Sequence, residues 1–411
     1  MQIKLESSKI HGNISAPASK SVMIRAIAAA IFCDNKTIIT NFTTCNDIET
    51  AISIAKTFGA EVKIYDNKLE ITGGKINNPA LINCGESALC ARIFAPIAAV
   101  FSDEFKITGE YSLLRRDMSD ILQALFALGL QCDEKKYLPF KIKGKLQGAK
   151  IKIDGSSSSQ TLSGLLMALQ LCQNDSIIDV ENLNSKPYID LTINILADFG
   201  ITVINENYQR FFIKGKQQYK SCTLNAEGDW SGISCLFVAA AVGGKITVSN
   251  LCLQSKQADI AILDALRLCG ANVSFEEDEI TVEKNQLQAF EFDATHCPDL
   301  FPAIVALAAN CVGTSVINGV QRLQNKESNR AETLQNEFAK LCIKIDIDNN
   351  KMYIRGDNIN SAVTHAHNDH RTAMALAVAS VNANGNIIIE NAECVAKSYP
   401  NFWNDFLKLK S

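Results

Sequence analysis

The stretch from Ile189 to Gly215 reads IDLTINILADFGITVINENYQRFFIKG and contains the structural unit on which the whole chain is built. Its first part is an amphipathic helix pattern, which ends at Gly200, and its second part has the pattern of a β-hairpin. Glycine suits this junction because it readily adopts the left-handed conformation that closes a helix. The stretch therefore predicts a helix followed by two antiparallel strands.

The same helix, glycine and hairpin pattern recurs along the chain. The glycines that end the helices are about 70 residues apart, and Cys342 stands near this position in the last copy. The glycines are Gly59, Gly129, Gly200 and Gly270. The other copies of the pattern are Ile48–Gly73, Ser119–Gly144, Asp259–Val282 and Glu332–Gly356.

A second, Ala-rich helix lies between these units and is apolar on nearly every side, which predicts burial inside a domain. These helices begin near Ser21, Ser87, Ser159, Asp229, Asp299 and Asp369. A β-branched strand follows each of them, at Thr37–Thr40, Phe105–Thr108, Ser176–Val180, Lys245–Val248, Thr314–Ile317 and Asn386–Glu390. Six units of about 70 residues fill 411 residues, so we expect an α/β (α+β) protein of two similar domains with three repeats each.

Composition limits the classes of function. Hydrophobic residues make up 47% of the chain and charged residues 20%, with a net charge of -4, as in a soluble globular protein without a broad basic surface for nucleic acid. The 14 cysteines form no Cys-x-x-Cys pair, which favours buried thiols in a reducing cytoplasm. We expect no signal peptide and no membrane span.

The starts of the buried helices carry the residues that indicate chemistry. Ser and Asp are common N-cap residues, but Lys20 and Arg371 place cations where the helix dipole opposes them. Basic side chains beside free N–H groups suit a bound phosphate or carboxylate. Lys20 and Arg371 stand at equivalent repeat positions in opposite halves, so they predict an anion site between the domains.

Other segments support this interpretation to different degrees. A buried Lys20 and Arg25 need an anionic partner, and the serines before Gln160 would bind phosphate well at the start of a helix over Thr161–Cys172. The segment Ser185–Tyr188 is equally explained as a turn. The segment Lys326–Arg330 is equally explained as an exposed helical turn with an i,i+3 ion pair. Asp299 is either an N-cap or a general base.

His365, His367 and His370 have the spacing of a metal cluster, but Arg371 beside them would repel a cation, so no metal site is expected. The motifs of phosphate loops, dinucleotide folds and serine hydrolases do not occur, which removes the usual support for nucleotide cofactors.

Taken in order, these segments closely resemble the 5-enolpyruvylshikimate-3-phosphate synthase family. The resemblance implies two domains of three βαβαββ repeats and an active site in the interdomain cleft. The implied domains are 20–227, on the shikimate 3-phosphate side, and 1–19 with 228–411. The matching segments are Lys20-Ser21 with Arg25, Gly109-Glu110 with Arg116, Ser158-Ser159-Gln160, Ser185-Lys186-Pro187-Tyr188, Glu227-Gly228-Asp229, Pro298-Asp299, Lys326-Glu327-Ser328-Asn329-Arg330, Asp369-His370-Arg371 and Ala396-Lys397-Ser398-Tyr399-Pro400.

The resemblance implies transfer of the enolpyruvyl group of phosphoenolpyruvate to the 5-hydroxyl of shikimate 3-phosphate by addition and elimination. It implies no metal or organic cofactor, no nucleic acid or membrane partner, and a cytoplasmic monomer in aromatic amino-acid biosynthesis. Asp299 would accept the hydroxyl proton, Glu327 or a lysine would protonate the methylene carbon, and Lys20 and Lys397 complete the catalytic set. The implied shikimate 3-phosphate ligands are Lys20, Ser21, Arg25, Ser158, Ser159, Gln160, Ser185, Tyr188, Asp299 and Lys326. The implied phosphoenolpyruvate ligands are Lys20, Ala88, Arg116, Gln160, Arg330, Arg371 and Lys397.

The chain departs from the family pattern at several positions. Ala88 stands where the family has a glycine against phosphoenolpyruvate, and its methyl group predicts reduced sensitivity to the inhibitor glyphosate. Leu89 replaces a threonine and Arg322 replaces an asparagine of some members, so the contacts of Arg92 and Arg322 stay open.

Three alternatives share the fold or its chemistry. UDP-N-acetylglucosamine enolpyruvyl transferases carry Lys-Asn where this chain has Lys20-Ser21, and a cysteine on the loop that corresponds to residues 109–117, where this chain has none. A non-catalytic anion-binding relative would lack a key residue such as Lys20 or Asp299, and both are present. An RNA 3′-phosphate cyclase would show a nucleotide or basic-surface signal.

Overall fold

The computed structural model describes residues 1–133 and 135–411, and the chain forms two compact units. One unit is Lys20–Ala226, and the other combines Met1–Ser19 with Glu227–Ser411. Glu227, which the sequence analysis placed in the first unit, falls in the second. Its carbonyl oxygen accepts from the Ser19 amide at 2.8 Å, and its carboxylate accepts from Ser255 and Gln257 at 2.8 and 2.9 Å.

The Lys20–Ala226 unit contains three four-stranded sheets, in the orders β14-β3-β5-β4, β6-β7-β9-β8 and β10-β11-β13-β12. In each sheet the first strand runs parallel to its neighbour, and the hairpin that follows is antiparallel. The strands are β3 Lys36–Thr40, β4 Glu61–Tyr65, β5 Lys68–Thr72, β6 Leu81–Asn83, β7 Glu104–Thr108, β8 Gln131–Cys132, β9 Phe140–Lys143, β10 Lys150–Asp154, β11 Ser176–Glu181, β12 Val203–Glu206, β13 Arg210–Ile213 and β14 Thr223–Asn225. The helices are α1 Lys20–Ala30, α2 Asn46–Thr57, α3 Ala88–Phe101, α4 Ser119–Ala127, α5 Ser159–Leu169 and α6 Lys186–Asp198, with a 3₁₀ turn, η1, at Tyr111–Arg115.

The second unit contains sheets β16-β17-β15-β2, β18-β19-β21-β20 and the three-stranded β1-β23-β22. Its strands are β1 Gln2–Leu5, β2 Ile10–Ser15, β15 Gly244–Ser249, β16 Asn272–Glu276, β17 Glu279–Glu283, β18 Glu291–Asp293, β19 Gly313–Asn318, β20 Lys344–Asp348, β21 Lys351–Gly356, β22 Asn360–His365 and β23 Asn384–Glu390. Its helices are α7 Trp230–Gly243, α8 Ile262–Leu268, α9 Phe301–Ala309, α10 Arg330–Lys340, α11 His370–Ser380 and α12 Phe402–Leu409. Its 3₁₀ turns are η2 Ala258–Ala261, η3 Pro298–Leu300, η4 Val320–Leu323 and η5 Ala392–Lys397.

The sixth repeat differs from the other five because no hairpin follows its helix. Instead, β1 from the start of the chain pairs antiparallel with β23 and takes the place of a hairpin strand. Where the chain passes from one unit to the other, near residues 19–20 and 226–227, the strand before the next helix also pairs with a distant strand. β2 leads along the chain into α1 but pairs with β15, and β14 leads into α7 but pairs with β3.

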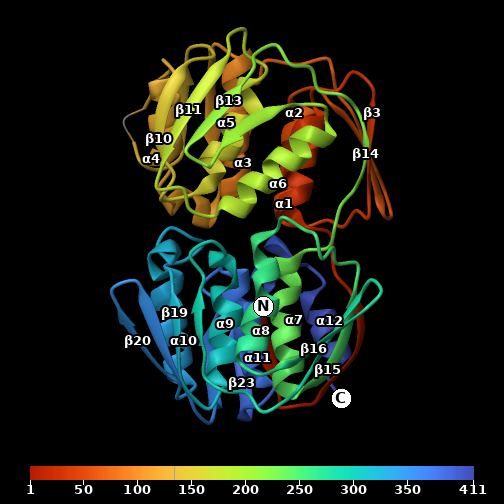
Figure 1. Ribbon diagram of the computed structural model, residues 1–411, viewed down its shortest axis with the longest axis vertical. Helices are drawn as coiled ribbons and strands as arrows, with labels where there is room; N and C mark the ends of the chain where they lie inside the picture. The colour runs from red at the N-terminus through yellow and green to blue at the C-terminus, as the bar shows by residue number, and fades with distance from the viewer. Residues whose placement is uncertain (134) are drawn as a thin grey trace. The chain divides into compact units, whose positions relative to one another are not determined.

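The predicted buried helices are confirmed. In the Lys20–Ala226 unit α3 packs against α1 and α5, and in the other unit α7, α9 and α11 pack against one another, with the sheets outside them (Figure 1). Every residue from Trp230 to Val242 of α7 is buried. This agrees with apolarity on all its faces.

The predicted helix ends are confirmed as well. Gly59, Gly129, Gly200 and Gly270 have φ angles of 100°, 87°, 79° and 89°, and Cys342 in the fifth copy adopts 67°. The same left-handed turn is therefore made by a residue with a side chain.

The prediction of an N-cap is wrong for Asp299. Ser87, Ser158, Asp229 and Asp369 accept backbone N–H groups at the starts of α3, α5, α7 and α11. Asp299 instead lies in η3, one turn before α9, and its carboxylate accepts from side chains. Pro298 and Pro302 around this turn lack an amide hydrogen, so fewer N–H groups need a cap.

No helix in the described residues is long and apolar enough to span a membrane.

Candidate active site

In the Lys20–Ala226 unit, Lys20 is the first residue of α1 and forms an ion pair with Asp47 at 2.8 Å. Both side chains are largely buried, with 16% and 7% exposed. Asp47 lies in the first turn of α2, where its negative charge also suits the helix dipole. The charge of Lys20, which opposes the dipole of α1, is thus balanced by the Asp47 carboxylate of α2.

Arg25 lies one turn into α1 and is 1% exposed. Its guanidinium donates to the Thr192 hydroxyl at 2.8 Å, the Ser21 carbonyl at 2.9 Å and the Ser163 hydroxyl at 3.3 Å. All three acceptors are neutral, and burial lowers the pKa of Arg25 to about 10. A buried cation that is held only by neutral oxygens is suited to bind an anion.

The serine run opens α5 as expected, although the helix begins at Ser159 and ends at Leu169. The Ser158 hydroxyl accepts from the Gln160 amide at 3.1 Å, and Ser159 is buried. The Gln160 Oε1 atom is buried and has no hydrogen-bond partner in the described part of the chain. It is therefore an acceptor available to a ligand.

Ser185 is the residue before α6 and has a left-handed backbone with φ 55° and ψ 43°. Such a conformation is strained for a residue other than glycine and often marks a functional position. Tyr188, in the first turn of α6, is linked to Arg25 through Thr192, which donates to its carbonyl oxygen at 2.8 Å. These hydrogen bonds link the start of α6 to α1.

Ala88 begins α3 and is 4% exposed, and Arg116, which follows η1, is 8% exposed. The Glu86 carboxylate accepts from both the amide and the hydroxyl of Ser112 in η1, at 3.1 and 2.6 Å. The start of α3 and the loop that carries Arg116 are thus held together by one carboxylate.

Sequence reasoning left the contacts of Arg92 open and missed Asp120. The buried Arg92 donates from Nε and Nη2 to the two oxygens of Asp120, at 2.8 and 3.0 Å. Burial opposes ionisation of Asp120, but the Arg92 charge and its hydrogen bonds lower the pKa of this carboxyl below its usual range. The i,i+28 separation of the pair gives no local sequence signal.

In the second unit, Asp299 is the centre of a cluster of cations. Its carboxylate accepts from Lys326 Nζ at 3.1 Å and Arg330 Nη1 at 3.0 Å, and Arg371 Nε lies at 3.7 Å. Burial opposes its charge, yet these three cations hold the pKa of Asp299 well below its usual range. Burial in turn lowers the pKa of Lys326 to about 8, although Asp299 acts against this shift.

Arg322 is the second residue whose contacts the sequence left open. Burial lowers the pKa of Arg322, and the charge of Asp299 counteracts that shift.

Arg330 is fully buried and contacts three carboxylates. Besides Asp299, it donates to Glu327 at 2.6 Å and to Asp369 at 2.8 and 3.2 Å. Burial disfavours its charge, but Asp369, Glu327 and Asp299 raise the pKa of Arg330. The segment Lys326–Arg330 is therefore neither exposed nor helical before Arg330, where α10 begins. These bonds occupy four of the five N–H hydrogens of the Arg330 guanidinium.

The start of α11 brings Arg371 and Lys397 into the same region. The Asp369 carboxylate accepts from the Arg371 amide at 3.0 Å, and the Lys397 ammonium, in η5, donates to the Asn368 carbonyl at 3.1 Å. His367 and Asn368 before the helix both have φ 55°, so left-handed residues stand beside this predicted site segment as Ser185 does at α6. Arg371 and Lys397 are 7% and 3% exposed.

Asp259 is a buried carboxylate that sequence reasoning did not single out, and Ser231 links it to Arg371. The Ser231 hydroxyl donates to Asp259, and the Ser231 carbonyl accepts from Arg371 at 3.3 Å. Burial, together with the charge of Asp299, raises the pKa of Asp259 to about 6. Many structural aspartates also lie in 3₁₀ turns, so the sequence around Asp259 does not mark it as a functional residue.

The three histidines do not gather at one point. His365 and His367 pack edge to face, and His367 contacts the buried Glu337 at 2.7 Å, whereas His370 is the first residue of α11. No group of three His, Cys, Asp or Glu side chains in the described residues is arranged to hold a metal ion.

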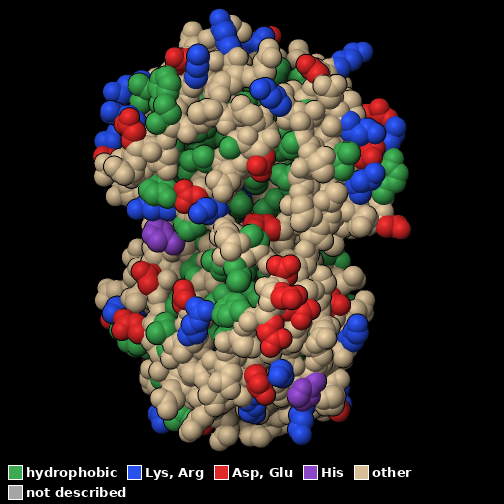
Figure 2. Space-filling view, turned by 45° about the vertical axis from the view of Figure 1, so that its right-hand side comes forward, with side chains coloured by type: hydrophobic (Ala, Val, Ile, Leu, Met, Phe, Trp, Pro, Cys, Tyr) green, Lys and Arg blue, Asp and Glu red, His purple; other side chains and the backbone are tan. Residues whose placement is uncertain are grey.

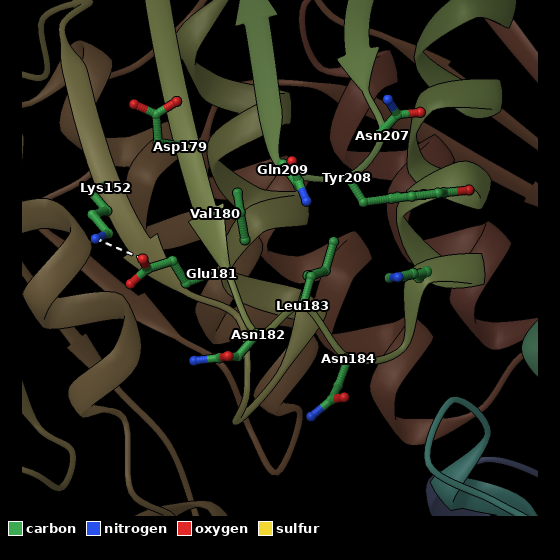
Figure 3. Close-up of a pocket in the computed structure, with 11 residues that line it drawn as sticks. Lys152, Asp179, Val180, Glu181, Asn182, Leu183, Asn184, Asn207, Tyr208 and Gln209 are labelled. Atoms are coloured by element: carbon green, nitrogen blue, oxygen red, sulfur yellow. Dashed lines mark ion pairs between the residues drawn. The ribbon is translucent and has the colours of Figure 1, made fainter.

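A pocket of about 890 Å³ opens on the Lys20–Ala226 unit (Figure 3). It is lined by both neighbours of Ser185, by Tyr208, and by the Lys152–Glu181 ion pair at 2.7 Å. None of the predicted site residues lines it. Over the face drawn in Figure 2, acidic and basic side chains occur on both units, and the basic side chains do not form one broad area.

Comparisons with known proteins give consistent results. Residues 5–406 match the family model described as EPSP synthase (3-phosphoshikimate 1-carboxyvinyltransferase). Proteins named 3-phosphoshikimate 1-carboxyvinyltransferase from Clostridium perfringens and Clostridium kluyveri are 35% and 34% identical, with 99% of this chain covered and 98% and 97% of those proteins. An EPSP synthase structure from Acinetobacter baumannii superposes with a TM-score of 0.83 at 22% identity, over 100% of this chain and 98% of that one. That structural likeness concerns the fold.

Proposed function

The chain belongs to the EPSP synthase family, and on this premise we propose that it transfers the enolpyruvyl group of phosphoenolpyruvate to the 5-hydroxyl of shikimate 3-phosphate and releases phosphate. The observation that carries the proposal is the convergence of Lys326, Arg330 and Arg371 on the single carboxylate of Asp299. This arrangement places a proton acceptor among cations that suit an anionic substrate.

Shikimate 3-phosphate is the ligand proposed for the cluster in the Lys20–Ala226 unit. Its phosphate would accept from Arg25, whose guanidinium now donates only to neutral groups, and from the hydroxyls of Ser158 and Ser159 at the start of α5. The other proposed ligands are Lys20, Ser21, Ser158, Ser159, Gln160, Ser185 and Tyr188, with Asp299 and Lys326 from the second unit.

Phosphoenolpyruvate is the ligand proposed for the second set of cations. The set consists of Lys20, Arg116, Arg330, Arg371 and Lys397, with Gln160 and Ala88 as neighbours. Several buried cations around one small trianion would orient it and stabilise the charge on the departing phosphate. Whether the sets from the two units meet at one site stays a prediction.

The low pKa of Asp299 has a consequence for its proposed role. A carboxylate held by three cations is ionised, as a general base must be, but it is a weak base. A bound phosphoenolpyruvate would share the charges of Arg330 and Arg371. Its arrival would therefore raise the proton affinity of Asp299 at the step that requires it.

The proposed chemistry has two steps. In the addition, Asp299 takes the 5-hydroxyl proton while the oxygen bonds to C2 of phosphoenolpyruvate and a proton from Glu327 or a lysine adds to C3. In the elimination, the group that protonated C3 takes a C3 proton back, the double bond forms again, and the C2–O bond breaks so that phosphate leaves. We propose that these steps use no metal or organic cofactor, and that the chain works as a cytoplasmic monomer.

Asp299→Asn tests this proposal, because asparagine keeps the shape but cannot accept a proton. We expect kcat to fall by about 10²–10⁴-fold with shikimate 3-phosphate binding retained, measured by titration calorimetry. The exposed Asp264→Asn on α8 is the control and should keep full turnover. A normal kcat in Asp299→Asn would exclude only the role of Asp299 as the base. A wild-type protein without turnover would exclude the proposed function itself.

A further inference from the structure

The Asp120 carboxylate is a junction between several elements of the Lys20–Ala226 unit. Besides the two bonds from Arg92 of α3, it accepts from the Thr161 hydroxyl of α5 at 2.7 Å and from the Ser157 hydroxyl at 3.4 Å. Asp120 itself lies in the first turn of α4. One buried carboxylate thus joins three helices and the loop that precedes α5.

The groups that this junction holds flank the proposed substrate ligands. Thr161 directly follows Gln160, and Ser157 directly precedes Ser158. Arg92 Nη2 also donates to the carbonyl of Asp117 at 3.2 Å, and Asp117 is the residue after Arg116. A shift of the Asp120 carboxylate would therefore move both the start of α5 and the loop that carries Arg116.

Two buried atoms near the junction point to a ligand. Arg92 uses Nε and Nη2, but its buried Nη1 has no hydrogen-bond partner in the part of the chain that the structure describes. The Gln160 Oε1 atom is likewise buried without a hydrogen-bond partner among the described residues. Buried polar atoms are normally paired, so a donor and an acceptor left over on neighbouring helices indicate that a bound molecule completes this region.

We propose that Asp120 is a positioning residue, which holds the start of α5 and the Arg116 loop in the geometry that binds the two anionic substrates. This inference rests on the proposed function. It assigns Asp120 no contact with the substrates: it acts through Thr161, Ser157 and Arg92. The geometry of anion-binding groups must be held within a fraction of an ångström, and a carboxylate bonded on several sides provides that support.

The decisive variants are at Thr161, because substitution of Asp120 leaves the buried Arg92 without a counter-charge and so disturbs folding as well as binding. Thr161→Val keeps the volume and the Arg92–Asp120 pair and removes only the hydroxyl. Thr161→Ser keeps the hydroxyl. The control, Thr37→Val, makes the same change at a buried threonine of β3, which is not part of the Asp120 junction.

We expect Thr161→Val to raise KM for shikimate 3-phosphate about tenfold, with kcat changed less than threefold and the thermal midpoint nearly unchanged. Thr161→Ser should restore KM, and Thr37→Val should leave it unaltered. An unchanged KM in Thr161→Val, or an equal defect in Thr161→Ser, would overturn the positioning role. In either case turnover by the wild-type protein shows that the proposed function stands, and its absence shows that the function itself has failed.

Discussion

Arg25 is the residue at which burial and charge conflict most clearly. Its guanidinium is buried and donates only to neutral oxygens, an arrangement that an anion would complete. We predict that Arg25→Met weakens the binding of shikimate 3-phosphate by about 100-fold, since a charged hydrogen bond to phosphate contributes about 1.5–3 kcal/mol. The thermal midpoint without ligand should not fall, because a desolvated charge has been removed. A calorimetric titration and a melting curve test both parts, and unchanged affinity would contradict the assignment.

Ala88 gives a prediction about inhibition. Its methyl group, at the first position of α3, is proposed to shorten the space beside phosphoenolpyruvate that glyphosate also occupies. Ala88→Gly should therefore lower the glyphosate concentration for half-inhibition by about tenfold or more, with little change in KM for phosphoenolpyruvate. The control is Ala95→Gly, deeper in the same helix. Equal inhibition of the wild type and Ala88→Gly would show that the methyl group is not the cause.

Asp259 predicts a pH dependence of stability. Its pKa is raised to about 6 in the folded chain, against about 3.9 for an unfolded aspartate, so between these values the folded state holds the extra proton. Stability therefore falls as pH rises through this window, and above pH 6 the folded chain contains a destabilising buried charge.

Asp259→Asn removes that titration. Relative to the wild type, the variant should gain about 1–2 kcal/mol in free energy of unfolding between pH 5 and pH 7.5, measured with urea. The exposed Asp264→Asn is the control. A wild-type to variant difference that does not change with pH would refute the prediction.

At the scale of elements, Cys342 shows what the repeat does to a single turn. It occupies the left-handed position that glycine fills in four other copies, and it is exposed. A left-handed conformation costs a residue with a side chain about 1 kcal/mol relative to glycine. Cys342→Gly should therefore raise the free energy of unfolding by about 1 kcal/mol.

The reverse change provides the matched control. Gly129 has φ 87°, and apart from its chain neighbours no atom of the described residues lies within 4 Å of an added Cβ, so Gly129→Ala tests the backbone conformation without a steric clash. It should lower the free energy of unfolding by about 1 kcal/mol. If both substitutions leave the denaturation midpoint unchanged, helix closure at these turns does not contribute as we describe.

Element types were predictable because each unit repeats the same local pattern. Helical periodicity and β-branched strands agree with the observed elements at every repeat but the sixth, whose hairpin strand comes from the distant N-terminus. Glycine stands at the helix end in four of these repeats. A cap was one of two alternatives for Asp299, and sequence could not exclude it because a 3₁₀ turn and an α-helix start look alike in sequence.

At the scale of the molecule, charge pairs between distant elements were the part that sequence could not provide. Arg92 with Asp120 and Arg371 with Asp299 join helices that are far apart along the chain, and their partners depend on tertiary packing. The sequence did predict that Arg25 is a buried cation, but it did not predict the burial of Arg92 or Arg330. It did not predict which carboxylates hold them before substrate arrives.

The proposed reaction needs side chains from both units, since Arg25 belongs to one and Asp299 to the other. The most direct test of the account is the release of phosphate by the purified intact chain, followed together with the appearance of the enolpyruvyl product. We predict that phosphate and product form in equal amounts, only when shikimate 3-phosphate and phosphoenolpyruvate are both present. No release at saturating concentrations of both substrates, or equal release from phosphoenolpyruvate alone, would contradict the account.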